Sequence, residues 1–491
     1  MDAWAPRPGA ANVTPFTLVP PRGCDPAHPF PSRGPRPIMV AMTIQAGLTG
    51  PPHAPDLRIR VWSDQPAPAV EVRMARTGEP IAGATILTRP VPAVIAGEPS
   101  LPRSVFEVAG LPPDTLVRIE LGGEACVVLT PPPPDGELRI LVGSCFYQPD
   151  DHGQLAAACA LLRDQDRPHI RLHGGDQLYL DAGALPDGPT ALARTLARYR
   201  QYWGDPAHAG YLRGGVTLFT PDDHDFWNDY PFSMPHLDRS WSGAWQEHSD
   251  AAGLAFVAYQ ALGNPEARSW FSLDLGLVSL FVLDTRTRRG TENRHPPSRL
   301  FDPDQRDALL DWSATLDKPG VLLSAMPLFQ KATGKFLGVI TGDHNLLHWE
   351  EDARQIWRAV ERAPWGVLVL AGDIHRGVFS EWRTGPPGAL RQHYELTTSP
   401  LRLLGYPWKP GRKAGAQPGG IQLGAELGRR DVARTYYGTS TDHFALLRFT
   451  PSPLGVRVTA DVHRVPDAVT PPSELEFDDP CRAGFYLRKE A

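Results

Sequence analysis

Five short clusters in this chain contain side chains that can bind metal ions or hold a phosphate group, and each cluster follows an apolar run. The clusters are Gly143-Ser144-Cys145, Gly175-Asp176-Gln177-Leu178-Tyr179, Asp222-Asp223-His224-Asp225, Asp284-Thr285-Arg286 and Gly372-Asp373-Ile374-His375. Carboxylate, imidazole, phenol and thiol groups are metal ligands, and a guanidinium group forms paired hydrogen bonds with phosphate oxygens. If the clusters meet, they would form a metal site that acts on a phosphorylated molecule.

The apolar runs before these clusters predict strands that bring the clusters together. The runs are Leu138–Val142, Ile170–Leu172, Val216–Phe219, Val278–Leu283 and Val367–Leu370. In layered α/β folds, ligands bind outside the carboxyl ends of the strands. We therefore expect the five clusters to converge on one site.

Helical patterns alternate with these strands after residue 135. Apolar residues recur at helical spacing over 153–163, 190–203 and 349–362, and Asp302-Pro303 is a helix-start signal. Cys159 lies on the apolar stripe of the first of these segments and is expected in the core. Residues 444–449 and 456–462 are typical of a β-hairpin. Together the patterns predict a layered α/β domain with two sheets.

The segment before Pro131–Pro134 differs in its pattern. Residues 57–62, 70–74, 104–108 and 117–121 alternate apolar and polar side chains, which is typical of half-buried strands. This pattern predicts a small all-β sandwich of immunoglobulin or fibronectin type III kind, and the four prolines predict a stiff linker. We therefore expect an N-terminal β-sandwich domain over 1–135 and an α/β domain over 136–491.

Composition narrows the classes of function. The chain has 491 residues and a net charge of -6, which does not favour an extended nucleic-acid surface. Its five cysteines are far apart and odd in number, unlike a disulfide framework. We see no secretory signal and no apolar run near the roughly 20 residues of a membrane helix, so a cytoplasmic location without a transmembrane segment is expected.

Taken singly, the clusters allow simpler interpretations. Asp176 and Tyr179 could share a metal ion, or they could form a glycine turn followed by a packed aromatic residue. Cys145 could be a small buried hydrophobe, and residues 222–225 could be a solvated Asx turn. Arg286 could pair with Asp284 at a strand end rather than hold phosphate.

In their order along the chain, the five clusters resemble the motifs of the PhoD-like alkaline phosphatases of the calcineurin-like metallophosphatase superfamily. The resemblance covers roughly residues 138–465. It implies a four-layer α/β/β/α sandwich, preceded here by the small all-β domain. It also implies hydrolysis of phosphate esters.

Metal ligands follow from the resemblance position by position. It implies an iron-type site from Cys145, Asp176, Tyr179 and His375, and an oxygen-rich neighbouring site from Asp176, Asp223 and Asp373. Thiolate, phenolate and carboxylate favour Fe(III), whereas carboxylate oxygens favour Ca²⁺, with manganese, magnesium or zinc as alternatives. The superfamily's further ligand of the second ion has no hard counterpart near Met326, so Asn228 is a substitute candidate.

The resemblance also implies catalytic roles. A metal-bound hydroxide would attack phosphorus in line. His224 would donate a proton to the leaving group or contact the transition state, and Arg286 would clamp the phosphate oxygens. Asp225, in the same motif as His224, is a third catalytic candidate.

The natural substrate stays open at this stage. The expected partner is a small phosphate ester, either a monoester or a diester, and no protein partner is indicated. A phospholipase- or nuclease-like phosphodiesterase is an alternative, because aromatic residues such as Phe146, Trp227 and Tyr230 could cover a lipid or stack a base. A non-catalytic binding descendant is the other alternative. The segment Gly405–Gly438 is interpreted as a surface loop or a lid over the site.

Overall fold

A computed structural model provides the structure of the chain. It describes residues 44–49, 57–63, 69–92, 95, 104–182, 186, 188–231, 245–290, 299–328, 349–385, 390–402, 421–422, 429–437, 441–465 and 484–489. The chain divides into two units, Met1–Val40 and Ala41–Ala491, and every described residue belongs to the second.

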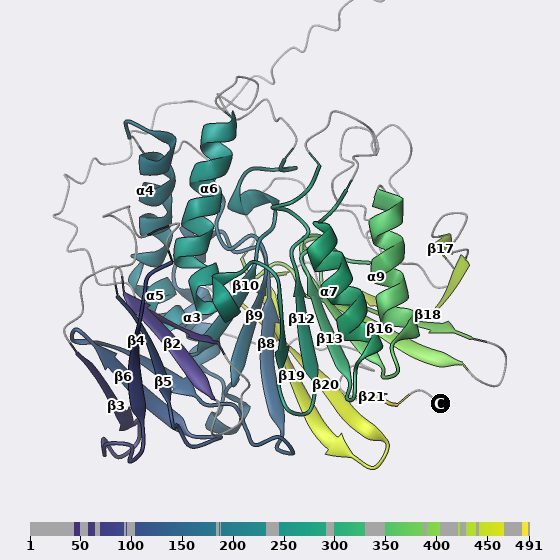
Figure 1. Ribbon diagram of the computed structural model, residues 1–491, viewed down its shortest axis with the longest axis horizontal. Coiled ribbons are helices and arrows are strands. Elements are labelled where there is room, and N and C mark those ends of the chain that lie inside the picture. Colours follow the sequence, from purple (N-terminus) through teal and green to yellow (C-terminus); the bar gives the residue numbers. More distant parts are fainter. Residues whose placement is uncertain are drawn as a thin grey trace, which may run out of the picture. The chain divides into compact units, whose positions relative to one another are not determined.

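A ten-stranded sheet carries the first three clusters (Figure 1). Its strands, in spatial order, are β21 (Phe485–Leu487), β20 (Gly455–Arg464), β19 (His443–Ser452), β8 (Leu138–Gly143), β9 (Ile170–Gly174), β10 (Val216–Thr220), β1 (Ile44–Leu48), β2 (Arg58–Ser63), β5 (Ser104–Ala109) and β4 (Thr85–Arg89). Strands β8, β9, β10 and β1 are parallel, and the other pairs are antiparallel. The parallel register places the carboxyl ends of β8, β9 and β10 at one edge.

A second sheet of eight strands carries the other two clusters. Its order is β11 (Phe271–Asp274), β12 (Ser279–Leu283), β13 (Gly320–Ser324), β14 (Val367–Ala371), β16 (Arg391–Thr397), β15 (Val378–Thr384), β18 (Arg429–Tyr437) and β17 (Ile421–Gln422). Strands β12, β13, β14 and β16 are parallel. Most of the segment 405–438 lies outside the described residues, apart from β17 and β18.

The side chains of each strand point alternately to the two faces of its sheet, and the inner faces of the two sheets pack against each other. Ile140 and Leu172 of the first sheet share a buried core with Leu323 and Leu370 of the second. The next residue along β8, Leu141, points to the opposite face and packs in a second core with helical residues. Because neighbouring strand residues alternate in side, strands that are apolar at every position are buried on both faces.

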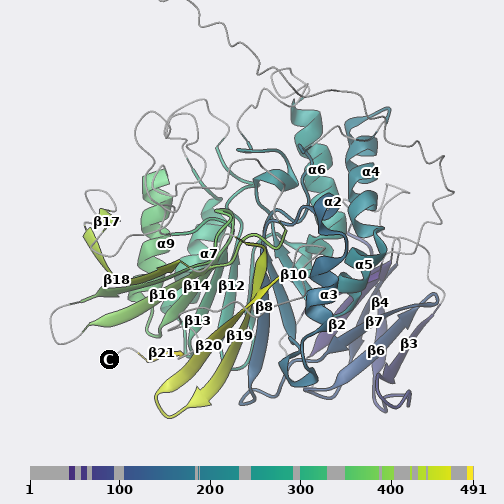
Figure 2. The same cartoon turned by 180° about the vertical axis from the view of Figure 1, so that it is seen from behind.

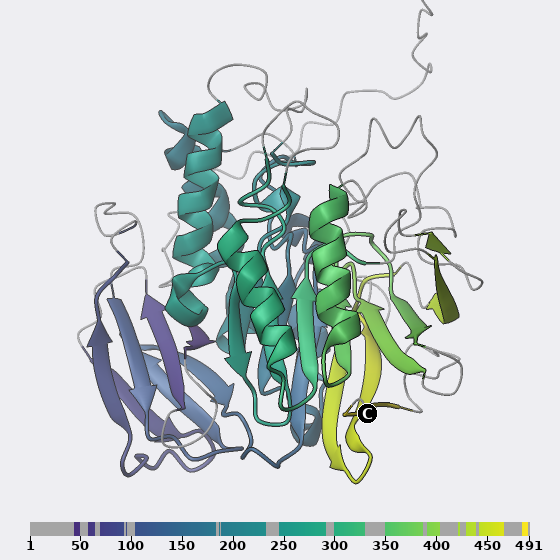
Figure 3. The same ribbon diagram turned by 45° about the vertical axis from the view of Figure 1, so that its right-hand side comes forward.

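Helices cover the outer faces of both sheets (Figure 2). The helices on the first sheet, all labelled in Figure 2, are α2 (Gln148–Asp151), α3 (Gln154–Ala160), α4 (Ala191–Trp203), α5 (Pro206–Arg213) and α6 (Trp245–Tyr259). The second is covered by α7 (Pro303–Ala314) and α9 (Glu350–Arg362), seen in front of its strands in Figure 3. Short 3-10 helices are η1 (Asp164–Asp166), η2 (Asp223–Asp225), η3 (Ala261–Gly263) and η4 (Pro265–Ala267). The predicted α/β/β/α sandwich is confirmed.

The all-β segment that precedes these layers is also confirmed. A three-stranded sheet of β3 (Val70–Met74), β6 (Leu116–Leu121) and β7 (Glu124–Leu129) shares its core with β2 and β5 of the ten-stranded sheet. Strand β1 pairs in parallel with β10, so the first sheet continues from this segment into the α/β layers. The domain boundary at residue 135 stays a prediction.

The side chain of Glu107 in β5 links the strands that residues 44–109 contribute to the first sheet. This carboxylate is 4 % exposed and accepts hydrogen bonds from Arg60 (2.9 Å), Arg89 (2.6 Å) and Thr49 (3.2 Å). Burial acts to raise the pKa of Glu107, but the hydrogen bonds and charges of Arg60 and Arg89 lower it below its ordinary value. Its ion pairs therefore stabilise the folded state above the unfolded pKa, and this stabilisation is lost as pH falls through the folded pKa.

We expect Glu107→Gln to lower the free energy of unfolding by about 2 kcal/mol at pH 7, because hydrogen bonds to a charged group are lost. The difference from wild type should shrink as pH falls from the unfolded pKa through the folded pKa of Glu107, because protonation removes the charge from the wild-type side chain as well. Urea denaturation at pH 7 and pH 3.5 measures both effects. Glu71→Gln, which removes an exposed partner of Arg73, is the control and should change stability by less than about 1 kcal/mol. A pH-independent difference would contradict the prediction.

Candidate metal centre

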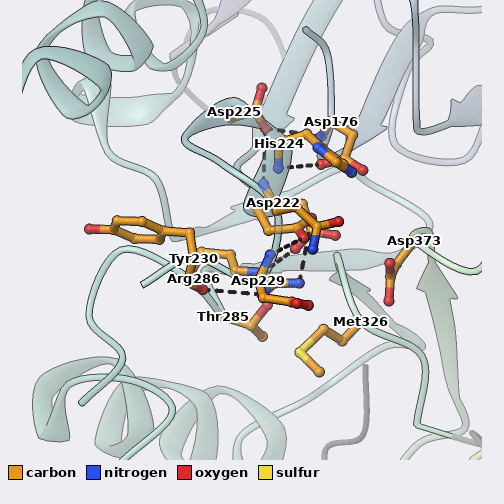
Figure 4. A network of polar contacts seen from close by, with 12 residues as sticks. Asp176, Asp222, His224, Asp225, Asp229, Tyr230, Thr285, Arg286, Met326 and Asp373 are labelled. Carbon is orange, nitrogen blue, oxygen red and sulfur yellow. Dashed lines mark hydrogen bonds and ion pairs between the residues drawn. The ribbon is translucent and has the colours of Figure 1, made fainter. Parts of the chain in front are cut away.

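The strand-end loops of the two sheets meet at one place. Cys145, Asp176 and Asp223 follow β8, β9 and β10 of the first sheet. Arg286 and Asp373 follow β12 and β14 of the second. Figure 4 shows residues of both sheets, among them Asp176, Asp222 and Asp373, around a common centre.

Buried acids gather there. Ligand atoms of Asp176, Asp223 and His224 all lie within 4.8 Å of one another, and so do those of Asp222, Asp223 and Asp373. Asp223 belongs to both groups and Asp222 is fully buried, while Asp373 is 7 % exposed. The two groups of ligand atoms therefore lie next to each other, because both include the carboxylate of Asp223.

The four residues expected at the iron-type site form two contacting pairs. The Sγ of Cys145 lies 3.4 Å from Oδ2 of Asp176 and 3.8 Å from the carbonyl oxygen of Asp373. The hydroxyl of Tyr179 lies 3.4 Å from Nε2 of His375. A thiol, a carboxylate, a phenol and an imidazole thus come from loops of both sheets.

Four of the candidate ligands have backbone conformations in the left-handed region of φ/ψ space. The φ angles of Cys145, Asp176, Asp373 and His375 are 58°, 56°, 66° and 50°. Such conformations cost on the order of 1–3 kcal/mol each for residues with a side chain, and they concentrate at functional sites. Gly175 has a φ of 89°, and a Cβ on it would lie 2.3 Å from Cβ of Asp222. Only glycine lets the Asp176 and Asp222 loops approach this closely.

Burial and negative charge raise the pKa values of three side chains in this cluster. Burial, then the charge of Asp223, raises the pKa of Asp176 well above its usual range. Burial, then the charge of Asp176, raises the pKa of the Cys145 thiol, and burial, then Cys145, raises the pKa of Tyr179. These groups are costly to ionise together without nearby positive charge.

The donor set fits metal ions. The Oδ1 of Asp223 is buried, makes no hydrogen bond within the described part of the chain, and lies 3.7 Å from Nη2 of Arg286. A buried carboxylate oxygen in this position is suited to coordinate a cation. Oxygen, thiol and phenol donors all suit metal ions, and the division into two sites stays a prediction.

Asp225 fixes the geometry of the acid loops. Its carboxylate accepts hydrogen bonds from the backbone N–H groups of Asp176 (2.9 Å), Gln177 (3.2 Å) and Asp222 (2.9 Å), and from Nε2 of Gln260 (2.9 Å). Burial raises the pKa of Asp225 to about 6. Both of its oxygens are engaged, so the geometry favours a positioning role, and the direct catalytic role stays a prediction.

His224 is oriented by an acid that the sequence analysis did not single out. Its Nδ1 lies 2.7 Å from Oδ1 of Asp181, and Oδ2 of Asp181 accepts the backbone N–H of Asn228 at 3.0 Å. Burial acts to lower the pKa of His224, but the charges of Asp181, Asp223 and Asp176 raise it well above its usual range. The signal for Asp181 in the sequence is an acid two residues after Tyr179. For Asn228, which contributes its backbone to this contact, the ligand role stays a prediction.

Arg286 is fully buried and contacts the acid cluster directly. Its Nε donates to Oδ1 of Asp222, and its Nη1 donates to the carbonyl oxygen of Tyr230 at 3.2 Å. Asp284, the partner considered from the sequence, instead accepts the backbone N–H of Arg286 at 2.9 Å. Arg286 therefore balances the charges of Asp222 and Asp223, and its role as a phosphate clamp stays a prediction.

Met326, near which the sequence offers no hard metal ligand, contacts an arginine. Nη2 of Arg289 lies 2.7 Å from the sulfur of Met326, and the guanidinium lies 4.4 Å from the ring centroid of Trp349. Met326 lies beside the acid cluster in Figure 4. Arg289 is 3 % exposed, so a buried positive charge stands near the place where a further hard ligand was sought.

The aromatic residues considered as a lipid or base surface are packed inside. Phe146 and Trp227 are each 1 % exposed, and Tyr230 is 6 % exposed. Tyr230 stacks on Phe226 with ring centroids 4.2 Å apart. These rings form core rather than an open surface.

Two β-sheets packed between helical layers, with buried acids and an imidazole at their strand ends, define a hydrolase of the metallophosphatase fold. A model of the PhoD-like phosphatase family matches residues 140–410, more than half of the chain, and the chain belongs to this family. The protein is accordingly a phosphoric ester hydrolase.

Solved structures agree with the fold. The structure titled "Structure of PhoD" aligns with a TM-score of 0.58 at 16% identity, over 91% of each chain. The purple acid phosphatase PPD1 from yellow lupin (Lupinus luteus) seeds aligns with a TM-score of 0.51 at 13% identity, over 87% of this chain and 73% of that one. No curated protein matches by sequence. No helix of the described residues is long and apolar enough to span a membrane.

Proposed function

We propose that this hydrolase cleaves small phosphate esters at a site that holds two metal ions. The observation that carries the proposal is the gathering of buried carboxylates in two adjoining groups of possible ligand atoms, which include Asp176, Asp223 and Asp373. We assign Fe(III) to Cys145, Asp176, Tyr179 and His375, because thiolate and phenolate favour a trivalent ion. We assign Ca²⁺ to Asp176, Asp223 and Asp373, with manganese, magnesium or zinc as alternatives.

When bound, the ions would supply Lewis acidity that activates water and neutralises charge on the phosphate oxygens. The chain supplies the remaining functions. Asp181 holds Nδ1 of His224, which leaves Nε2 to carry the proton that the leaving oxygen requires. Arg286 holds Asp222 in place, and Asp225 fixes the two loops that carry the acids. A non-catalytic binding protein is not favoured for a chain with this site.

Parallel assays test the substrate class. The purified protein is given an aryl phosphate monoester and the matching aryl diester under iron- and calcium-replete conditions. Because Phe146, Trp227 and Tyr230 are packed inside, we propose no base- or lipid-stacking surface from them. Hydrolysis of neither ester by a protein with both metals bound, as measured by elemental analysis, would overturn the proposal.

Removing the divalent ion should abolish most of the activity. Incubation with a calcium-selective chelator is expected to lower kcat by about 100-fold, which corresponds to roughly 3 kcal/mol of transition-state stabilisation. Added Ca²⁺ should restore the rate, because the carboxylates of Asp223 and Asp373 remain in place. The measurement is the rate with an aryl phosphate, together with calcium and iron content. Full activity in protein that retains iron but no divalent ion would contradict a second ion.

A further inference from the structure

Tyr147 is a partly exposed aromatic residue beside the proposed metal centre. Its backbone N–H donates to the carbonyl oxygen of Arg402 (3.0 Å), and Arg402 in turn donates its N–H to the carbonyl oxygen of Cys145 (3.1 Å). These two hydrogen bonds belong to an isolated parallel bridge between Phe146 and Arg402. Tyr147 is therefore held in place two residues after a proposed iron ligand, immediately before α2.

The extended backbone at this bridge turns the side chains of Phe146 and Tyr147 to opposite sides. Phe146 points into the core, where it stacks on His208 with ring centroids 4.7 Å apart. Tyr147 points the other way and packs edge-on against the ring of Tyr179, with centroids 5.6 Å apart. Because the hydroxyl of Tyr179 lies 3.4 Å from Nε2 of His375, the side chain of Tyr147 is on the metal-binding side of its loop.

Three partly exposed side chains contact Tyr179, which is itself 1 % exposed. They are Tyr147, His375 and His224, whose ring centroid lies 4.2 Å from that of Tyr179. The side chain of His224 is 15 % exposed. Solvent therefore reaches the candidate centre at these three residues, and a substrate can approach it from the same side.

We propose that Tyr147 is a specificity-determining residue whose ring contacts the organic group of the substrate and favours phosphate esters with an aromatic leaving group. The inference rests on the proposed function, in which His224 donates a proton to the leaving oxygen. The leaving group then lies at His224, and both His224 and Tyr147 pack against the ring of Tyr179. Aromatic rings attract one another in offset-stacked and edge-to-face arrangements. A flat aromatic group that extends from the phosphate therefore finds a matching surface at Tyr147.

The experiment compares wild type with Tyr147→Ala on phenyl phosphate and ethyl phosphate. We expect KM for phenyl phosphate to rise about 10-fold in the variant, because a ring contact with the bound substrate is lost. The value of kcat should stay near that of wild type, since this contact is the same in the ground state and the transition state. KM for ethyl phosphate should not change. Tyr147→Phe keeps the ring and should match wild type with both esters.

Tyr486→Ala is the matched control. Tyr486 is also a partly exposed tyrosine, and it lies in β21, the outermost strand on one side of the first sheet. This variant should show wild-type kinetics with both esters. Metal content is measured by elemental analysis for every variant. A Tyr147→Ala protein that loses metal, or that loses activity equally with both esters, would show a structural role and would overturn the inference.

Inhibition of the wild-type protein by phosphonates gives a reading that needs no variant. Phenylphosphonate and methylphosphonate differ in their organic group, and neither has a leaving oxygen to protonate. We expect phenylphosphonate to bind about 10-fold more tightly. Equal inhibition by the two, or an unchanged KM for phenyl phosphate in Tyr147→Ala, overturns the inference while leaving the phosphatase activity intact. Wild-type protein that holds both metals and hydrolyses neither ester instead overturns the proposed function itself.

Discussion

Asp176→Asn is expected to lower kcat on the order of 10³-fold or more and to reduce the content of both metals. Asp176 is the one residue assigned to both proposed ions, and its Oδ2 lies 3.4 Å from the sulfur of Cys145. The amide keeps the shape of the side chain but removes the charge and one of the two oxygen donors. Oδ1 also accepts the backbone N–H of His224 at 3.1 Å, so the single oxygen of the amide would have to serve either this hydrogen bond or a metal ion.

Metal content by elemental analysis and the rate with an aryl phosphate are measured together for this variant. Asp274→Asn is the control, because Asp274 is a partly exposed carboxylate that pairs with Lys318 at 2.9 Å, and it lies beside the start of β12, at the opposite end of that strand from the Asp284–Arg286 cluster. It should retain both metals and full activity. An Asp176→Asn protein with wild-type metal content and rate would exclude Asp176 from the site.

His224→Ala is expected to lower kcat by about 100-fold or more while metal content stays at the wild-type level. The imidazole is held on one side by Asp181, and its ring centroid lies 4.2 Å from that of Tyr179. This packing fixes the ring so that Nε2 is the nitrogen left to donate a proton. The loss should be larger for an alkyl phosphate than for a nitrophenyl phosphate, because an alkoxide leaves poorly without a proton.

The comparison of leaving groups separates proton donation from a structural effect. A variant that merely misplaces the acid loop should lose activity equally with both esters and should lose metal as well. His152→Ala is the control, since His152 is an exposed residue at the end of α2, and it should match wild type. Equal rates for His224→Ala and wild type with the alkyl ester would remove His224 from this role.

Much of the α/β architecture is readable from the local pattern. The predicted segments 190–203 and 349–362 correspond to α4 and α9, and Thr190 caps α4 by accepting the N–H of Ala193 at 3.1 Å. Each predicted strand before a cluster is present. These segments were readable because a buried strand or an amphipathic helix carries its signal in its own residues.

Other elements carry no such signal. Strand β4 is exposed at four of its five positions, so its side chains do not alternate between core and solvent. In α6, Ala251, Ala252, Ala255 and Ala258 are buried on more than one side, so no polar face marks the helix. Both elements exist because neighbouring elements pack against them, which a local pattern does not report.

By itself, the sequence determined which ligand types are present, their order and their place at strand ends, because those properties depend on residue identity and on short-range periodicity. Only the tertiary structure decided the partners: Arg286 pairs with Asp222, 64 positions away, His224 pairs with Asp181, and Asp176 contacts the sulfur of Cys145. Side-chain partners across two sheets depend on how the sheets pack and on left-handed turns such as those at Cys145 and Asp373. No spacing along the chain encodes those contacts directly, since the buried cores between the layers set the distances between the loops.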